Sequence, residues 1–330
     1  MSILVTGGAG YIGSHMVLEL LDAGEQVVIL DDLSTGHRFA VAQKAKLVVG
    51  DIGNRELVRK IIRDENVEAI IHFAGSIVVS ESVEAPLAYH HNNTVKTHAL
   101  LEAAQSSGIK HFIFSSSAAV YGMPQQNPVF EEAPLAPISP YGSSKMMSEI
   151  MLREVALAHD FRYVALRYFN VAGADPKGRS GESRHNVTHL IEVAAQVAHG
   201  QRPCFKLFGT DYQTPDGTCV RDYIHVSDLA SAHSSALSHL RSGGESKVLN
   251  CGYGKGYSVR EVIDAFQKTV GVEFPVETAA RRPGDPDSLV AGASLIGQEL
   301  NWTPQHDDLN TMVRQAYAWE KHLMEEGFRD

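Results

Sequence analysis

The chain has 330 residues, of which 44% are hydrophobic and 21% charged, which is typical of a globular protein with one large domain or two that share an interface. Its formal net charge of −10, with no compensating basic run, argues against a non-specific nucleic-acid surface. No apolar run approaches the roughly 20 residues of a membrane span, no signal peptide is evident, and the widely spaced Cys204, Cys219 and Cys251 predict a reducing, cytoplasmic setting.

The chain opens with a strand, a glycine turn and a helix. Residues 3–5 form a short apolar run, glycines follow at Gly7, Gly10 and Gly13, and apolar side chains then recur at helical spacing over 12–21. The first glycine permits a tight turn, the second lets a pyrophosphate approach the backbone, and the third lets the helix pack against its strand. The helix N-terminus would then face the phosphates of a dinucleotide.

A second strand, over residues 26–30, ends in Asp31 and Asp32, about 20 residues after the glycine turn. An acid at this place can accept hydrogen bonds from a ribose 2′-hydroxyl, and it would repel a 2′-phosphate. The sequence therefore predicts an NAD site rather than an NADP site.

Strands and helices continue to alternate through the first half of the chain. Predicted strands cover residues 47–50, 69–73, 111–114 and 163–168, and predicted helices cover 55–65, 94–105 and 141–159. This alternation predicts an α/β protein with a Rossmann-type doubly wound parallel sheet. Small or polar residues stand at successive strand ends, where such sheets bind ligands: Gly7, Asp31, Asp51, Ala74 and Ser115 to Ser117.

A proline-rich segment over residues 123–140 leads into a helix that carries Tyr141 and Lys145. Ser139 can cap this helix, and Pro140 suits its first position. Tyr141 would lie in the first turn, where the helix dipole and the nearby Lys145 favour a phenolate and predict a lowered pKa. Such a tyrosine is a candidate general base, although the pair alone is equally consistent with ordinary packing at a helix start.

The second half of the chain is smaller and more irregular, with polar loops at 175–184 and 211–218, helices at 190–199, 259–270 and 309–324, and a return strand at 248–250. We expect an NAD-binding Rossmann domain over residues 1–169, with return segments near 222–250. Residues 170–330 should form mainly a smaller mixed α/β substrate-binding domain.

The glycine turn, Ser117 at a strand end and the Tyr141–Lys145 pair together resemble the extended short-chain dehydrogenase/reductase family. The similar segments include residues 6–15, 115–122, 139–145 and 167–170. Two later segments, 216–226 and Arg281-Arg282-Pro283-Gly284-Asp285, are more specific and resemble the UDP-glucose 4-epimerase branch of that family. The resemblance covers almost the whole chain.

The resemblance implies an NAD-dependent isomerase of galactose metabolism that interconverts UDP-galactose and UDP-glucose by transient oxidation at C4. Tyr141 would take the proton of the sugar 4-hydroxyl, Ser117 would bind the 4-oxygen and relay the proton, and Lys145 would bind the nicotinamide ribose. The 4-keto sugar would rotate to present its other face before the hydride returns. A tightly held NAD is expected, because loss of NADH at this stage would strand the keto intermediate. Members of the family are commonly homodimers, here through the helices at 94–105 and 144–159.

The resemblance also implies two sets of binding residues. The cofactor set consists of Tyr11, Ile12, Asp31, Asp51, Ile52, Phe73, Ala74, Asn92, Lys145 and Tyr168. The set for the uridine diphosphate end consists of Asn170, Asn186, Arg221, Arg282 and Asp285. Guanidinium groups match phosphate oxygens well, although each arginine could instead be an ordinary solvated charge.

Three positions depart from the family pattern. Ile77 stands where many members carry a lysine that contacts the pyrophosphate, and Cys219 replaces a usual glycine near Arg221. Leu289 lies near the residue that bounds the sugar pocket in the family, where a tyrosine accompanies hexoses only and a small residue admits N-acetyl sugars. Because leucine is intermediate in size, we expect weak or partial activity on UDP-N-acetylglucosamine.

Several rival functions remain open to different degrees. A dehydratase or decarboxylase would carry an acid pair where this chain has Ala118 and Ala119, and a non-catalytic NAD sensor would lack the catalytic trio. An epimerase for UDP-xylose, UDP-glucuronate or UDP-N-acetylglucosamine is harder to distinguish. His185 and His189 are four residues apart, but no third ligand is evident, so no metal site is predicted.

Overall fold

A computed structural model describes residues 1–282 and 285–328 of the chain. Pro283 and Gly284, which belong to the second epimerase-like segment, lie outside the described residues. Among the residues that are described, no helix is long and apolar enough to cross a membrane.

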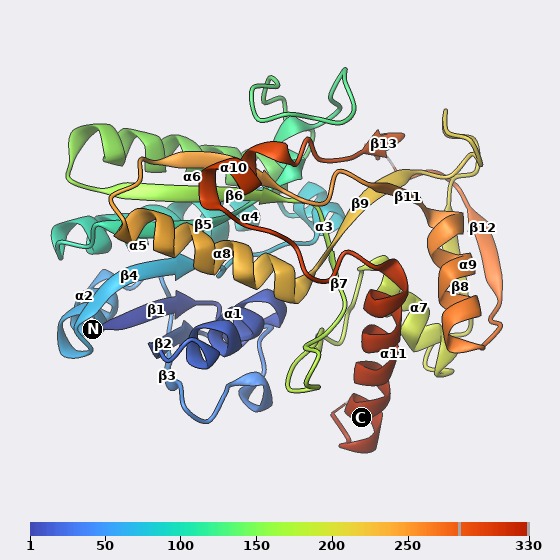
Figure 1. The fold of residues 1–330 in the computed structure, drawn as a ribbon, viewed down its shortest axis with the longest axis horizontal. Helices are drawn as coiled ribbons and strands as arrows, with labels where there is room; N and C mark the ends of the chain where they lie inside the picture. Colours follow the sequence, from blue (N-terminus) through green and yellow to red (C-terminus); the bar gives the residue numbers. More distant parts are fainter. Residues whose placement is uncertain (283–284, 329–330) are drawn as a thin grey trace.

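The larger part of the molecule is built on a seven-stranded sheet in which every neighbouring pair is parallel (Figure 1). Its spatial order is β10-β6-β5-β4-β1-β2-β3. The strands are β1 (Ser2–Thr6), β2 (Gln26–Asp31), β3 (Lys46–Val49), β4 (Val67–His72), β5 (His111–Ser117), β6 (Arg162–Tyr168) and β10 (Lys247–Cys251). The predicted doubly wound Rossmann-type fold is therefore confirmed.

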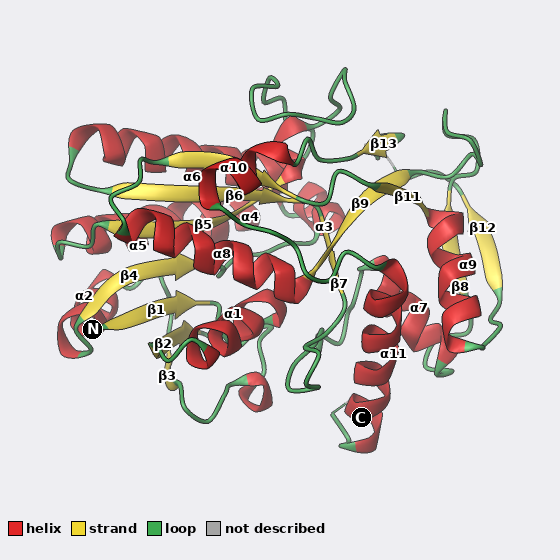
Figure 2. Cartoon of the chain, in the orientation of Figure 1, coloured by secondary structure: helices red, strands yellow, loops and turns green. Residues whose placement is uncertain are grey.

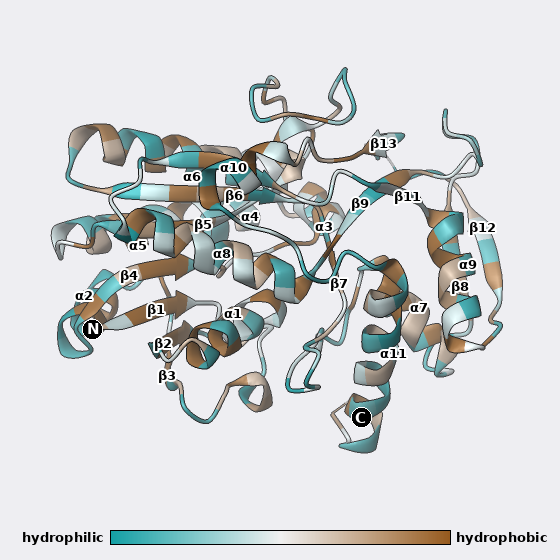
Figure 3. Cartoon of the chain, viewed as in Figure 1, coloured by the Kyte–Doolittle hydropathy of each residue, from teal (hydrophilic) through white to brown (hydrophobic). Residues whose placement is uncertain are grey.

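Helices cover both faces of this sheet, as expected when every strand is connected by a crossover. One face carries α1 (Tyr11–Asp22), α8 (Val226–Arg241) and α10 (Ser294–Leu300), and the other carries α2 (Arg55–Asp64), α5 (Lys96–Ser106) and α6 (Pro140–Ala158). A hydrophobic core lies on each face of the sheet, and alternate residues of β1 contribute to them. Ile3 and Val5 pack in the core that contains Met16, whereas Leu4 packs in the core that contains Leu100. Figure 3 shows β1 and β4 as hydrophobic strands between helices of mixed hydropathy.

A smaller mixed α/β region follows at the far end of the sheet (Figure 2). Its strands are β7 (Asn170–Ala172), β9 (Val220–His225), β11 (Gly256–Ser258) and β13 (Ser288–Leu289), and a separate parallel pair, β8 (Phe205–Phe208) and β12 (Val276–Ala279). Helices α7 (Leu190–Ala198), α9 (Val259–Val270) and α11 (Leu309–Glu325) share a third core. The chain crosses between the regions several times, because α8, β10 and α10 return to the large sheet.

The stretch before α5, for which the sequence predicted a helix only from residue 94, contains further helical turns. Short helices α3 (Val79–Glu84) and α4 (Pro86–Tyr89) precede a π-helical turn over His90–Val95. The side-chain oxygen of Asn93 on this turn accepts from Ser76 N at 2.8 Å, and its amide donates to Ser144 Oγ at 3.0 Å. Such wide turns often occur at functional sites, and this one ties α6 to the end of β4.

Candidate active site

The glycine turn between β1 and α1 is held by contacts that exclude larger side chains. Gly7 has a φ of +71°, and a Cβ there would lie 2.6 Å from Ala74 N at the end of β4. A Cβ on Gly13 would overlap the carbonyl oxygen of Gly7. Gly10 differs, because a Cβ there would touch only Gly7 O at 3.4 Å. The backbone at Gly10 is therefore the part of the turn that a ligand can approach.

The first turn of α1 suits a pyrophosphate. Gly10 stands at its N-cap, no side chain caps the helix, and no acidic residue lies in the first turn. The N-terminal end of a helix has free N–H groups and a partial positive charge, so it can bind an anion. Ile12 and the backbone of Tyr11 belong to this turn, which fits their predicted place in the cofactor site.

Asp31 ends β2 beside the glycine turn. Its carboxylate accepts from Ala9 N at 2.9 Å and from Leu33 N at 2.8 Å. Burial raises the pKa of this carboxyl, and the two backbone N–H groups oppose the rise. The group is thus braced by the glycine turn itself, and each of its oxygens retains a lone pair for a ribose hydroxyl.

Asp51 and Ile52, also predicted for the cofactor site, follow β3, and Asn92 lies on the π-helical turn before α5. Asp51 Oδ2 pairs with Lys96 Nζ at 2.8 Å, and Asp51 Oδ1 accepts from Gly53 N at 2.7 Å. Burial alone would raise the pKa of Asp51, but these two partners outweigh it and lower the pKa. Ile52 is buried in the core beneath it, and Asn92 donates to Ser76 Oγ at 2.9 Å.

Phe73 and Ala74 follow the end of β4, and Tyr168 is the last residue of β6, so they lie at one edge of the sheet on either side of β5. The Phe73 ring packs 4.7 Å from the ring of His233, centroid to centroid. The hydroxyl of Tyr168 is 2.5 Å from Ser115 Oγ. These contacts fix both aromatic rings next to the strand that ends in Ser117.

The catalytic trio is assembled by β5 and α6. Ser117 is the last residue of β5, and Ser139 caps α6 by accepting from Gly142 N at 3.1 Å, with Pro140 as the first helical residue. Tyr141 then lies in the first turn with only 6% of its surface exposed, and Ser117 is close enough to the phenol to lower its pKa. The predicted cap and the predicted meeting of Ser117 with Tyr141 are both present.

The predicted lowering of the Tyr141 pKa is wrong for the protein alone. Burial raises the pKa of Tyr141, and the hydrogen bond from Ser117 only partly offsets the rise. Lys145 does not pair with the phenol: its Nζ donates to Ser115 O at 2.9 Å and lies 5.0 Å from the centroid of the Phe114 ring. Burial also lowers the pKa of Lys145 to about 8, although Glu149 opposes the change.

Of the residues predicted for the uridine diphosphate, the structure brings Arg221 and Asp285 together at β9. Arg221 Nη2 lies 3.4 Å from Asp285 Oδ1, and Arg221 is paired in register with Leu289 of β13. The guanidinium of Arg282 lies 3.9 Å from the centroid of the Phe208 ring on β8. Asn170 begins β7 and pairs in register with the residue two places after Arg221. Asn186 is exposed on the loop before α7.

The three departures from the family pattern are also placed. Ile77 is half-buried just before α3, and Leu289 packs against the cluster that contains Tyr121 and Phe169. Cys219 is buried beside β9, and burial raises the pKa of its thiol. Nothing in the structure explains why a cysteine stands there.

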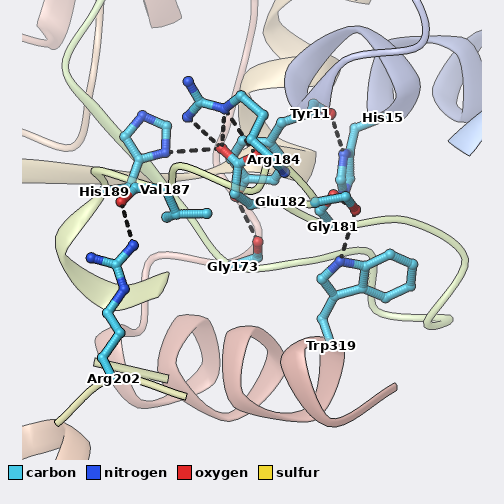
Figure 4. A network of polar contacts seen from close by, with 11 residues as sticks. Tyr11, His15, Gly173, Gly181, Glu182, Arg184, Val187, His189, Arg202 and Trp319 are labelled. Atoms are coloured by element: carbon cyan, nitrogen blue, oxygen red, sulfur yellow. Dashed lines mark hydrogen bonds and ion pairs between the residues drawn. The ribbon is translucent and has the colours of Figure 1, made fainter. Parts of the chain in front are cut away.

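Figure 4 shows a polar cluster that joins the two regions and that the sequence did not reveal. Tyr11 Oη donates to Gly173 O at 2.6 Å, so its side chain turns away from the glycine turn toward the smaller region. Glu182 is buried and pairs with Arg184 Nη2 at 2.7 Å and with His189 Nδ1 at 3.3 Å. Any contact of Tyr11 with a cofactor must therefore come from its backbone.

His185 and His189 do not share a ligand position. The His185 ring lies edge-on to His37 with 5.7 Å between centroids, whereas His189 pairs with Glu182. Within residues 1–282 and 285–328, no group of three or more His, Cys, Asp or Glu side chains is placed to hold a metal ion.

Glu192 on α7 adjoins the cluster, and neither carboxyl oxygen has a hydrogen-bond partner. Burial raises its pKa to about 7, with His189 opposing the change and Glu182 adding to it. A carboxyl whose pKa is raised by folding stabilises the protein fully below its unfolded pKa, and this stability is lost as pH rises through the folded pKa. Glu192→Gln should therefore raise the free energy of unfolding at pH 8 by up to about 3 kcal/mol, with little change at pH 4.5.

Urea unfolding at both pH values measures this effect. Glu154→Gln is the matched control, because Glu154 is exposed on α6 and should not alter the pH dependence. Equal pH dependence in wild type and Glu192→Gln would show that Glu192 is not a protonated buried acid.

The chain is similar to known proteins along nearly all of its length. Residues 3–252 match the family model described as NAD dependent epimerase/dehydratase family. The UDP-glucose 4-epimerase of Azospirillum brasilense is 56% identical over 321 residues, which cover 97% of this chain and 92% of that protein.

Two solved structures are similar as well. The UDP-glucose 4-epimerase from Brucella ovis in complex with NAD has a TM-score of 0.93 and 43% identity, with 96% of this chain and 97% of that chain covered. The UDP-Glc/GlcNAc 4-epimerase from Campylobacter jejuni has a TM-score of 0.85 and 46% identity, with 97% and 99% covered. With the glycine turn and the Ser117–Tyr141–Lys145 arrangement in place, the chain belongs to the NAD dependent epimerase/dehydratase family.

Proposed function

We propose that this chain interconverts UDP-galactose and UDP-glucose by transient oxidation at C4 of the sugar, with NAD held throughout. The observation that carries the proposal is that Ser117 and Tyr141 lie close together, buried at the edge of the sheet where the glycine turn also lies. The names of its relatives support the same reaction.

The residues present fit NAD. The uncapped first turn of α1 would hold the pyrophosphate, Asp31 the ribose hydroxyls, and Asp51 with Ile52 the adenine end. When bound, NAD accepts the hydride from C4 and returns it, and its positively charged nicotinamide ring favours the phenolate of a tyrosine beside it. The raised pKa of Tyr141 in the protein alone is consistent with a base that becomes active only in the loaded site.

The side chains of the protein would then move the proton. Tyr141 takes the proton of the sugar 4-hydroxyl and later returns it, while the nearby Ser117 hydroxyl orients the 4-oxygen. Lys145 holds its ammonium group close to the end of β5, because its Nζ donates a hydrogen bond to Ser115 O. Burial of all three side chains excludes bulk water from the proton transfer.

The uridine diphosphate end would lie against the smaller region. Arg221 and Arg282 can bind the phosphate oxygens, and Asp285 can accept from ribose hydroxyls once it leaves Arg221. Asn170 and Asn186 would complete this set. Ala118 follows Ser117 without any acid, which disfavours elimination chemistry.

The experiment is to incubate the purified protein with UDP-galactose, without added NAD, and to measure UDP-glucose. Conversion is expected, because the cofactor should stay bound through purification. The proposal fails if no UDP-glucose forms even when NAD is supplied.

Leu289 favours a second substrate, UDP-N-acetylglucosamine. Its half-buried side chain lies beside Arg221 in register, and the relative from Campylobacter jejuni is named for both sugars. Leu289→Tyr should lower the kcat/KM ratio of UDP-N-acetylglucosamine to UDP-glucose by about 10-fold, because a larger side chain fills the space of an acetamido group. Leu135→Tyr, a change in the same cluster, is the control. An unchanged ratio in Leu289→Tyr would contradict the pocket assignment.

We further infer a cytoplasmic homodimer. Met147 and Leu157 are exposed on α6 although both are apolar, and a partner copy that packs on α5 and α6 would bury them. All three cysteines are free thiols, which suits a reducing compartment. Sedimentation equilibrium should give twice the mass of the chain.

A further inference from the structure

A buried carboxylate, Glu149, lies one helical turn beyond Lys145 on α6 and has no part in the proton transfer proposed above. Its Oε1 accepts a hydrogen bond from Ser116 Oγ at 2.5 Å, and Ser116 immediately precedes Ser117 at the end of β5. Glu149 therefore joins the helix that carries Tyr141 to the strand that carries Ser117.

Arg167 of β6 balances the charge of Glu149. Its Nη2 lies 2.6 Å from Glu149 Oε2 and its Nε 2.9 Å from Oε1, and both side chains are only 6% exposed. The remaining Nη1 donates to Tyr121 Oη at 2.9 Å and to Glu131 O at 3.2 Å. A buried ion pair contributes little net stability, so stability alone is a weak reason for this arrangement.

The network extends into the segment that leads to α6. Tyr121 Oη donates to Asn250 Oδ1 at 2.7 Å, and Asn250 Nδ2 donates to Val129 O at 2.9 Å. Asn250 N donates to Glu131 Oε1 at 2.8 Å. The proline-rich segment over 123–139 is thus tied to β6 and β10, and this fixes where α6 begins.

We propose that Glu149 is a positioning residue, which acts through Ser116 to hold the hydroxyl of Ser117 against Tyr141. The role rests on the function proposed above. Ser117 and Tyr141 come from different elements, so the distance between their hydroxyls depends on the spacing between β5 and α6. The link from Glu149 to Ser116 sets that spacing, and small errors in such a spacing reduce rates strongly.

The negative charge of Glu149 also acts on Lys145, one helical turn away on α6. Burial lowers the pKa of Lys145 to about 8, and Glu149 is what opposes this change. His72 on β4 also faces Lys145, but burial and Lys145 lower its pKa to about 3, so it is neutral. The other titratable and charged groups near the two side chains are Tyr141 on α6, Arg167 and Tyr163 on β6, and Tyr121 after β5.

The first test is Ser116→Ala, which removes the link to β5 and leaves the Glu149–Arg167 pair intact. We expect kcat to fall at least about 10-fold, with KM, bound NAD and unfolding temperature nearly unchanged. Ser82→Ala is the matched control, because Ser82 is equally buried and its hydroxyl donates to Val79 O within α3.

The second test is Glu149→Gln, which keeps the shape of the side chain and removes its charge. Since Glu149 raises the pKa of Lys145, its loss should move the alkaline fall of kcat to lower pH, by about one unit. A purely structural role would lower kcat equally at every pH.

The outcomes separate cleanly. The positioning role would be overturned if the wild type converts UDP-galactose and the kcat of Ser116→Ala stays within twofold of it. The proposed function would then remain intact. If Glu149→Gln does not fold, Ser116→Ala decides the question. If the wild type does not convert UDP-galactose, the proposed function itself is wrong.

Discussion

Tyr141→Phe should lower kcat by about 1,000-fold, within the range that a positioned general base contributes. The change removes one oxygen from a side chain that is almost fully buried and leaves its ring in place. The protein should therefore fold, and it should retain its bound NAD, because Asp31 and the first turn of α1 lie on other elements and Lys145 is unchanged. Steady-state kinetics with UDP-galactose and the absorbance of released NAD measure both effects.

Tyr163→Phe is the matched control for this variant. Tyr163 is also 6% exposed and lies on β6, away from the end of the strand. Its loss of a hydroxyl should leave kcat within twofold of wild type. If Tyr141→Phe keeps the kcat of the wild type, Tyr141 is not the general base.

Gly13→Ala should be the most damaging single change in the cofactor site. The added methyl group would overlap the carbonyl oxygen of Gly7, and a backbone atom held by the sheet cannot move aside as a flexible side chain can. We expect a loss of about 3 kcal/mol in the free energy of unfolding, together with loss of bound NAD. Urea unfolding and cofactor content after purification test this expectation.

Gly297→Ala offers the comparison for that variant. Gly297 lies in α10, where a Cβ would meet Trp302 O at 3.3 Å, and alanine favours the helix. It should retain NAD and nearly all of its stability. Equal behaviour of the two variants would contradict the close packing assigned to the glycine turn.

The large sheet could be predicted because its signals are local. Glycine spacing, apolar runs and helical periodicity each lie within about 20 residues, and parallel topology follows from their alternation. The smaller region could not be predicted in the same detail. Strand β9 pairs with β7, which lies about 50 residues earlier, and with the two-residue β13, which lies about 60 residues later, and no local pattern encodes such pairings.

The site was predictable in its residues and less so in its electrostatics. Ser117 and Tyr141 meet as expected, but the phenol is so deeply buried that its pKa rises, and burial depth is not visible in a spacing of four residues. The side chain of Tyr11 turns to Gly173, which lies 162 positions away. The Glu149–Arg167 pair likewise joins two elements whose contact appears only in three dimensions.

The most direct test of the account uses UDP-galactose that carries deuterium at C4. In the presence of excess unlabelled NADH in solution, the UDP-glucose formed should keep its deuterium at C4, because the atom removed from one face is returned to the other without leaving the site. Formation of UDP-glucose with hydrogen at C4 would contradict a transient oxidation on a held cofactor.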